Sequence, residues 1–497
     1  MALDYQCTTL KFAITIDEPM GGRSGMCGLD LTRERRGILT ALQACKLDFP
    51  LHIAIDGGTF RHQDSQHLVR LVQQTLDDHD VSTLHHLRIA TADQLGKSAA
   101  LTVRLEADSK NAEPHATLQP YAAVLDVHHS GFQAAPHASS LQPLASYIAE
   151  NLRDLFADEQ AALTHLLSNS GFSVPNIRLS PEEVGSLDQR SNRAFKYAPK
   201  YHLAFSLFSG STTPSNWDIQ NALQEYLEPL LASFSSISTF SVDTQVQLYA
   251  SLSPSMRGPT LDAETNSWTV QRSDLSGFIN AAEWPLSPSI GVGPTINFVL
   301  YVPSEKQRPL KVKETGGTSW LIPQWGGVQI LNPSASQQAR GNLTREDLQP
   351  IMLTFADQLV SLLGLPPHPA SLPLRLQGLT RERAASTIVS ASSTLGALAR
   401  LTLKLTSIAI PDNVATSVDK TIHHLEQACA DLREARYDDA LKNARSAEAE
   451  AEQAFFEPSM VGQVYFPDEH KVAVYVPLLG PMAVPLVMAL LLSLIHI

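Results

Sequence analysis

The sequence predicts an α/β protein in which a mixed β-sheet is flanked by helices and followed by a helical region and a C-terminal transmembrane helix. Three observations predict this class. Short apolar runs alternate with helical patterns over residues 1–200, nearly continuous apolar strands recur after residue 200, and the pattern is helical from Thr344 onward. At 497 residues with 43% hydrophobic content, the chain is expected to form more than one domain.

Residues 1–200 form the first predicted domain, an α/β part. Strands are predicted at Leu10–Ile16, Phe49–Ile55 and Tyr121–Val127, because each is a short apolar run. Between them, His67–Leu76 carries apolar residues at helical spacing. A second helical stripe contains Leu141, Leu144, Ile148, Leu152 and Leu155. These alternating patterns indicate a mainly parallel or mixed sheet.

Residues 201–343 form the second predicted domain, which is rich in strands, after a polar stretch at Ser191–Lys200. Trp217–Phe234 has the three-and-four spacing of an amphipathic helix. The paired Gly326 and Gly327 permit positive φ or a close backbone approach, and indicate either a tight turn or part of a ligand site. Strands are predicted around Leu203, Phe205 and Leu207, at Phe240–Ala250, and at Pro294–Pro303 in the centre of a sheet.

Residues 344–456 form the third predicted region, which is helical. The first helix follows Thr344, a candidate N-cap, and ends near Gly364. Two further helices are predicted at Glu382–Ser407 and at Asp412–Phe456, the second with a break near Tyr437. Together they suggest a helical hairpin or bundle.

Residues 472–497 form the last predicted element, a transmembrane helix. Val472–Ile497 carries no formal charge, and about 24 residues at a rise of 1.5 Å give roughly 36 Å, enough to cross a hydrocarbon core of about 30 Å. A soluble core helix of this length would have a polar face. A cleaved attachment signal would follow a small-residue site and a long polar spacer, which the preceding run YFPDEHK lacks.

Charge and cysteine content exclude some functions and leave others open. A formal net charge of −13 argues against sequence-independent binding of nucleic acid, which needs a basic surface. Cys7, Cys27, Cys45 and Cys429 form no CxxC pair for zinc. Disulfides among the first three remain possible if that segment is lumenal.

No motif in the chain predicts a catalytic site or a bound cofactor. Ser24 and Cys27 share the Gly-rich loop GGRSGMCG, but this loop does not match G-x-S-x-G. Neither of the usual phosphate-binding glycine motifs occurs. We therefore predict no catalytic residue and no cofactor.

Three pairs of adjacent histidines raise the question of a metal site: His85 with His86, His128 with His129, and His423 with His424. Adjacent side chains point to opposite faces of a strand, or about 100° apart on a helix, so each pair supplies a single ligand to any site. We predict surface histidines and no metal.

Several of these stretches resemble one family, the PIG-S subunit of the glycosylphosphatidylinositol (GPI) transamidase. The most specific is FPDEHKVAVYVPL, which enters the apolar tail. The others precede it and occur in this order from about residue 200: YHLAFSLF, NWDIQNALQEYLEPLLASF, FSVDTQVQLYA, INFVLYVPSEKQRPL and QWGGVQILN.

The resemblance implies a largely lumenal protein of the endoplasmic reticulum membrane. It implies a non-catalytic subunit of a complex that attaches GPI anchors to the C-terminus of precursor proteins, with the chemistry in a separate, cysteine-protease-like subunit. It also implies glycosylation of Asn342, in the sequon Asn342-Leu343-Thr344. Pro477, Pro481 and Pro485 share one face of the tail helix, and we expect this face to pack against other subunits.

The chain departs from the family at its two ends. The first 60 residues contain no run of roughly 17 to 25 apolar residues, and no basic segment follows the tail, so we expect an incomplete sequence. Two other functions stay open: a tail-anchored scaffold or adaptor protein, and a membrane-tethered α/β hydrolase using Ser24 and Cys27.

Overall fold

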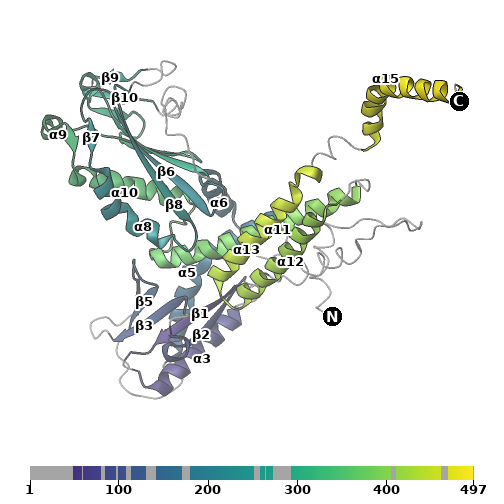
Figure 1. The fold of residues 1–497 in the computed structure, drawn as a ribbon. Helices are drawn as coiled ribbons and strands as arrows, with labels where there is room; N and C mark the ends of the chain where they lie inside the picture. Colours follow the sequence, from purple (N-terminus) through teal and green to yellow (C-terminus); the bar gives the residue numbers. More distant parts are fainter. Residues whose placement is uncertain are drawn as a thin grey trace.

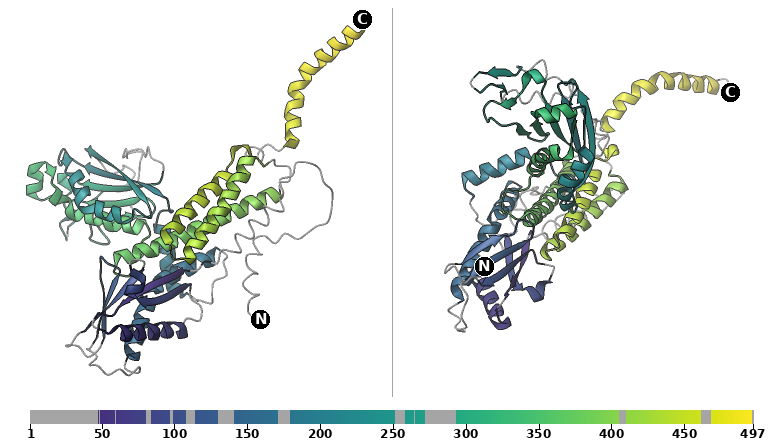
Figure 2. Two further views of the ribbon diagram at one scale, coloured as in Figure 1. Left: turned by 60° about the horizontal axis from the view of Figure 1, so that its bottom comes forward. Right: turned by 90° about the vertical axis from the view of Figure 1, so that its left-hand side faces the viewer.

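The structure is a computed structural model that describes residues 47, 49–58, 60–79, 84–96, 99–107, 114–129, 141–170, 179–250, 258–263, 265–271, 293–404, 410–460 and 468–495. Two lobes, each containing a sheet, are joined by a helical bundle, and a C-terminal helix lies apart from them (Figures 1 and 2). The predicted strand at Leu10–Ile16 lies outside the described residues. The divisions at residues 200, 343 and 456 stay predictions.

The first sheet, which we call sheet A, has five strands in the order β2-β1-β3-β5-β4. Neighbouring strands are parallel, except that β4 is antiparallel to β5. The predicted strand Tyr121–Val127 begins later, because Tyr121 lies in a turn and is 89% exposed. The strands are β1 (Phe49–Asp56), β2 (His85–Thr91), β3 (Leu101–Ala107), β4 (His115–Leu118) and β5 (Val124–His129).

Two long helices pack against sheet A, α3 (His62–His79) and α5 (Gln142–Asn169), while α4 (Ala92–Leu95) is a single turn. Their apolar stripes fall where the sequence predicts them. Burying those stripes on the alternating apolar side chains of the strands forms one core. This core includes Leu51, Ile53, Leu68, Val72, Val103, Ile148 and Leu152.

The second sheet, sheet B, also has five strands, in the order β13-β14-β11-β6-β8. Only β13 is antiparallel to its neighbour. Strand β11 is buried along most of its length in the middle of the sheet, which confirms the prediction for Pro294–Pro303. The strands are β6 (Lys200–Ser209), β8 (Thr239–Leu248), β11 (Thr295–Val302), β13 (Ser319–Ile322) and β14 (Gly326–Ile330).

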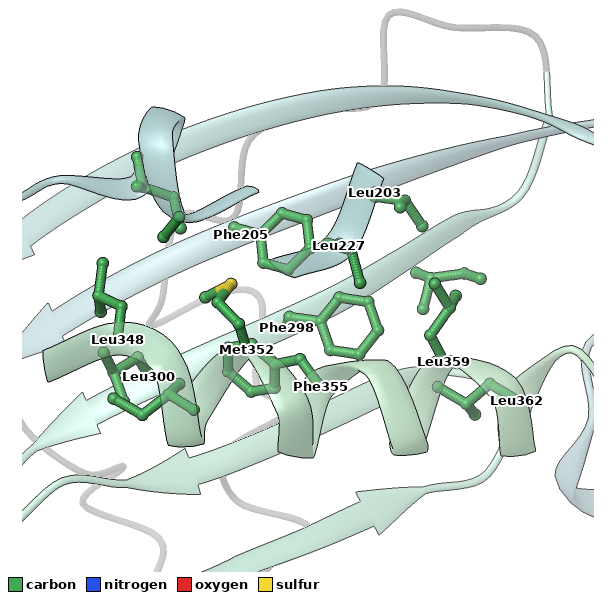
Figure 3. Close-up of a cluster of buried hydrophobic side chains, with 14 of the residues drawn as sticks. Leu203, Phe205, Leu227, Phe298, Leu300, Leu348, Met352, Phe355, Leu359 and Leu362 are labelled. Atoms are coloured by element: carbon green, nitrogen blue, oxygen red, sulfur yellow. The ribbon is translucent and has the colours of Figure 1, made fainter. Parts of the chain in front are cut away.

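Helices cover one face of sheet B. The predicted helix Trp217–Phe234 is present as α7 (Ile219–Ala222), the π-helical turn η3 (Leu223–Leu227) and α8 (Glu228–Ser233). Beside it lies α10 (Arg345–Leu362), which Thr344 caps as expected. Figure 3 shows the resulting core, where the ring of Phe298 lies 5.1 Å from that of Phe205 and 5.1 Å from that of Phe355.

Smaller elements complete this lobe. A three-stranded sheet, β12-β10-β9, packs on the other face of sheet B, where Phe208, Val270, Tyr301 and Leu310 are buried together. The remaining elements are β7 (Asn216–Trp217), β9 (Thr260–Asp262), β10 (Ser267–Val270), η5 (Glu305–Gln307), β12 (Leu310–Val312), α9 (Ala335–Arg340) and β15 (Asn342–Leu343).

The glycine pair lies at the start of strand β14. A Cβ on Gly326 would lie 1.8 Å from the carbonyl oxygen of Asn297, and one on Gly327 would lie 1.8 Å from Oε1 of Gln358. The close approach that glycine permits is found at both positions. Of the two alternatives for the pair, the tight turn is the one present, because Gly326 directly follows the turn at residues 323–325 between β13 and β14.

Three helices form the bundle: α11 (Leu372–Lys404), α12 (Asp412–Arg433) and α13 (Tyr437–Phe455). The predicted break near Tyr437 is confirmed, but α11 begins well before Glu382. Helix α6 (Pro181–Arg193) lies between α5 and sheet B in the chain. Small buried side chains permit close packing in the bundle, including Ala384, Ala391, Ala428, Ala440, Ala444 and Ala447.

The C-terminal segment forms α15 (Asp468–Ile495), as its helical prediction requires. Among the helices of the described residues, none meets the combined requirement of length and apolarity for a membrane span, so the transmembrane assignment has no support here. Pro477, Pro481 and Pro485 lie inside this helix and are exposed.

The described cysteine, Cys429, is 2% exposed on α12 and is disulfide-bonded. The disulfides considered from the sequence involved Cys7, Cys27 and Cys45, which lie outside the described residues. A disulfide that includes Cys429 was not among those alternatives.

Candidate functional site

Three consecutive residues of α11, Arg381, Glu382 and Arg383, connect the bundle to both lobes. Consecutive helical residues point about 100° apart, so each side chain reaches a different neighbour. We call this set the α11 junction. Arg381 is buried and the other two are partly buried, and the geometry of the set shows how the lobes are held.

Arg381 forms a buried ion pair with Glu159 of α5. Its Nε lies 2.5 Å from Oε1 of Glu159 and its Nη2 lies 2.7 Å from Oε2, which is a two-point contact. Nε2 of His85, in β2, lies 3.1 Å from the same Oε1. The Arg381 and His85 side chains are 1% and 2% exposed. Helix α11 is thereby tied to α5 and to the edge of sheet A.

The electrostatics of this pair favour the charged forms. Burial by itself raises the pKa of the Glu159 carboxyl, but the Arg381 guanidinium and His85 hold that pKa well below its usual range. The guanidinium also lies 5.2 Å above the ring centroid of Tyr437, whose hydroxyl donates to the carbonyl oxygen of Pro50 at 2.6 Å. The junction therefore reaches strand β1 as well.

The other two residues of the junction contact α6 and the segment that precedes sheet B. Nη2 of Arg190, on α6, lies 2.8 Å from both carboxylate oxygens of Glu382. The guanidinium of Arg383 lies 5.5 Å from the ring centroid of Tyr197, and Arg445 of α13 lies at the same distance. Burial raises the pKa of Tyr197 to about 12, against the opposing effect of Arg445.

Tyr197 precedes sheet B in the chain and fixes that lobe to the bundle. Its hydroxyl donates to the carbonyl oxygen of Ile237 at 3.1 Å and accepts from Nε of Arg445. A cleft of about 500 Å³ opens beside these groups, lined by residues that include His165, Asp188 and Glu448. Because each side chain of the junction binds a group on another element, its chemical role is to position those elements.

Sequence reasoning did not identify this junction. The signal was present as the run TRERAAS, in which charged residues interrupt a stripe of buried small residues at Ala384 and Ala385. Charged side chains are rarely fully buried unless they are paired, so this run could have predicted buried partners. It could not have identified Glu159, which lies 222 residues away in the chain.

The predicted glycosylation residue, Asn342, is exposed in the two-residue strand β15, which pairs with β7. The sequon threonine, Thr344, accepts from the backbone N–H of Asp347 at 3.3 Å and donates to its Oδ2 at 2.9 Å. Burial opposes ionisation of Asp347, but hydrogen bonds from Gln337 and Thr344 lower its pKa. A shallow hollow of about 460 Å³ surrounds the asparagine.

The other sequence candidates are not brought together. Ser24 and Cys27 lie outside the described residues. The expectation of surface histidines is wrong for His85 and His129, which are 3% and 4% exposed, because His85 packs against Glu159 and Phe156 of α5 and His129 packs against Phe60. Within the described part of the chain, no three His, Cys, Asp or Glu side chains are grouped so as to hold a metal ion.

The fold and this junction define a class: a two-lobed α/β protein in which a helical bundle holds two open sheets in a fixed relation. The chain belongs to the PIG-S family, described as "Phosphatidylinositol-glycan biosynthesis class S protein", which matches residues 38–496. The resemblance seen in the sequence is thereby confirmed.

Similar proteins are named as components of one complex. The chain is 32% identical over 334 residues to "GPI-anchor transamidase component PIGS" of Bos taurus, covering 62% of this chain and 59% of that protein. It is 32% identical over 302 residues to the "GPI transamidase component PIG-S homolog" of Schizosaccharomyces pombe, covering 58% and 52%. It is 28% identical over 311 residues to "GPI transamidase component GPI17" of Saccharomyces cerevisiae, covering 58% and 57%. The matches thus span little more than half of these relatives.

Proposed function

We propose that this protein is a non-catalytic subunit of the GPI transamidase complex, which attaches GPI anchors to the C-terminus of precursor proteins. The observation that carries the proposal is family membership across residues 38–496, together with relatives named as components of that complex. Its partners are the other subunits, including the cysteine-protease-like one that performs the chemistry.

The proposed role is to hold other subunits in position. The α11 junction supports it, because a buried two-point ion pair and a tyrosine between two guanidinium groups fix the relative orientation of two sheets. Fixed surfaces lower the entropic cost of binding several partners at once.

We infer that the bulk of the chain lies in the lumen of the endoplasmic reticulum. Two independent features support this location. Cys429 is disulfide-bonded, and disulfides persist in oxidising compartments. Asn342 is exposed within a sequon, and glycans are added to such residues only in the secretory pathway.

We further propose that α15 holds the chain at the membrane, as a transmembrane anchor, and that the face carrying Pro477, Pro481 and Pro485 contacts other subunits. The support is a row of apolar side chains that are more than half exposed, among them Leu479, Met482, Leu486 and Leu490. Resistance of the chain to alkaline extraction from microsomes tests the anchor. Leucine at all three prolines should weaken assembly, and unchanged assembly would count against that face.

The central experiment is depletion of the chain from cells followed by re-expression. We expect loss of surface GPI-anchored reporters on depletion, recovery on re-expression, and co-purification with the cysteine-protease-like subunit. Recovery with no co-purification would refute the subunit assignment. Amide hydrolysis by the purified chain alone, lost on joint replacement of Ser24 and Cys27, would instead favour a hydrolase.

A gel shift after enzymatic removal of N-glycans tests the location. Asn342→Gln should abolish the shift, whereas Asn332→Gln, at an asparagine outside any sequon, should leave it intact. If neither the parent nor Asn332→Gln shows the shift, the cytosolic adaptor alternative is favoured. Asn342→Gln keeps the Thr344 cap, so its effect is separated from helix stability.

A further inference from the structure

Strand β8 forms a long edge of sheet B. It is ten residues long, and β6 is its neighbour on one side. The backbone N–H of Thr239 donates to the carbonyl oxygen of Pro199 at 2.9 Å, toward β6. Because backbone groups alternate along a parallel ladder, those of Phe240, Val242, Thr244 and Val246 point away from the sheet. No strand among the described residues pairs with this side.

Side chains also alternate along β8. Ser241, Asp243 and Gln245 turn to one face, where the first two contact His202 at 3.0 and 3.1 Å and the third donates to Ser206 at 2.9 Å. The alternate residues turn to the helical face. There Val242 and Val246 are 38% and 39% exposed. Proteins usually protect an edge from pairing with charged residues, above all lysine, or with proline. The strand contains no lysine, arginine or proline, and its charged residue, Asp243, contacts His202.

A groove of about 840 Å³ runs between this edge and the helical segment α7-η3-α8. Its apolar lining includes Ile219, Leu223, Leu231, Phe240 and Val242, and among the described residues that line it Glu228 is the charged one. The π-helical turn Leu223–Leu227 forms part of its wall. Such turns are rare and occur frequently at functional sites.

We propose that this groove binds an extended segment of a partner polypeptide, which adds a strand to sheet B alongside β8. The outward backbone groups supply the donors and acceptors of a new ladder, and the apolar lining receives every second side chain. Glu228 selects a segment with a lysine or arginine at that position. A second copy of the chain offers β8 itself, whose charged residue is Asp243, and so gives Glu228 no cation. The proposal stands apart from the transamidase assignment.

The test uses the full chain in detergent and a fluorescent peptide that alternates valine and threonine with one central lysine. Fluorescence anisotropy should show saturable binding. Val242→Pro removes one outward N–H without touching the ladder to β6, and should weaken binding about tenfold. Val242→Thr retains that N–H and the branched shape, so it loses only apolar contact and should bind more tightly than Val242→Pro.

Two further comparisons keep the test valid if the proline variant folds poorly. Methylation of the peptide's alternate backbone nitrogens should abolish binding, because the ladder then loses its donors. Glu228→Gln should weaken binding of the lysine peptide about two- to fivefold while leaving a threonine-substituted peptide unaffected. Equal binding of methylated and unmethylated peptide overturns the proposal. So does a dimer of the chain that Val242→Pro converts to monomer, since a second copy then occupies the edge.

Discussion

Sheets A and B share one plan, with four parallel strands and one antiparallel strand at an edge, but they differ at their long edges. In sheet A the outer strand β2 is covered. The side chain of Gln73 on α3 donates to the carbonyl oxygen of Leu87 at 3.1 Å and accepts from the N–H of Ile89 at 2.9 Å. In sheet B, no described side chain makes such contacts with the outward groups of β8.

The two sheets differ in how their unpaired edge strands are protected. An unpaired edge is a template for another strand, and proteins usually close it unless it has a partner. Sheet A is closed by one amide side chain and is also fixed to the bundle through Arg381 and Glu159. Sheet B leaves ten residues of edge beside a groove. We therefore expect changes in sheet A to affect stability and changes at β8 to affect binding.

The largest expected effect is on the attachment of sheet A. Arg381→Leu leaves the Glu159 carboxylate buried without its main partner and should lower the free energy of unfolding by about 3–5 kcal/mol, measured by denaturant titration. The control is Arg345→Leu, because solvent screens its 2.8 Å pair with the half-exposed Glu225, so the midpoint of the titration should stay close to that of the parent. Adding Glu159→Leu to Arg381→Leu should recover part of the loss; no recovery would mean that the pair is not the cause.

The same pair predicts a pH dependence. The pKa of Glu159 is depressed in the folded state, so its contribution is fully present above the unfolded pKa of about 4.3 and is lost as the pH falls toward the folded value. The difference in unfolding free energy between the parent and Glu159→Gln should be constant from about pH 5 to 8 and should shrink below about pH 4. A difference that is independent of pH down to acid unfolding would contradict this assignment.

A smaller effect is expected from uncovering β2. Gln73→Ala leaves one N–H and one carbonyl group of the edge without this partner and should destabilise the protein by about 1–3 kcal/mol. Gln74→Ala changes the exposed neighbour on the same helix and should be close to neutral. If both variants unfold at the same denaturant concentration as the parent, the side chain of Gln73 does not protect the edge.

The smallest effect on stability is expected at β8. Val242 is 38% exposed, so Val242→Lys should change the free energy of unfolding by no more than about 0.5 kcal/mol. The same change places a charge on the edge and should prevent binding of the strand-forming peptide. If Val242→Lys loses stability and still binds the peptide, β8 contributes to stability and not to binding, contrary to our expectation.

Much of the fold was predictable because its signals are local. The stripes of α3 and α5, the apolar run of β11 and the Thr344 cap lie within short windows of sequence, where spacing alone decides which face is buried. The start of α11 was missed because Pro373 and Gly378, residues that usually interrupt a helix, lie in its first turns. Strand β5 was placed too early because the turn at Tyr121 is followed by apolar residues. The buried histidines were misassigned because the burial of a polar side chain depends on a partner elsewhere in the chain, which local spacing does not reveal.

By itself the sequence determined the α/β class, most elements and membership of the PIG-S family, because periodicity and ordered motifs survive without knowledge of contacts. The tertiary structure alone decided the order of the strands, the pairing of Arg381 with Glu159, and which edge Gln73 covers. Those features join residues far apart in the chain. Their free energy depends on geometry that only the closed fold creates, where burial makes an ion pair or an uncovered edge consequential.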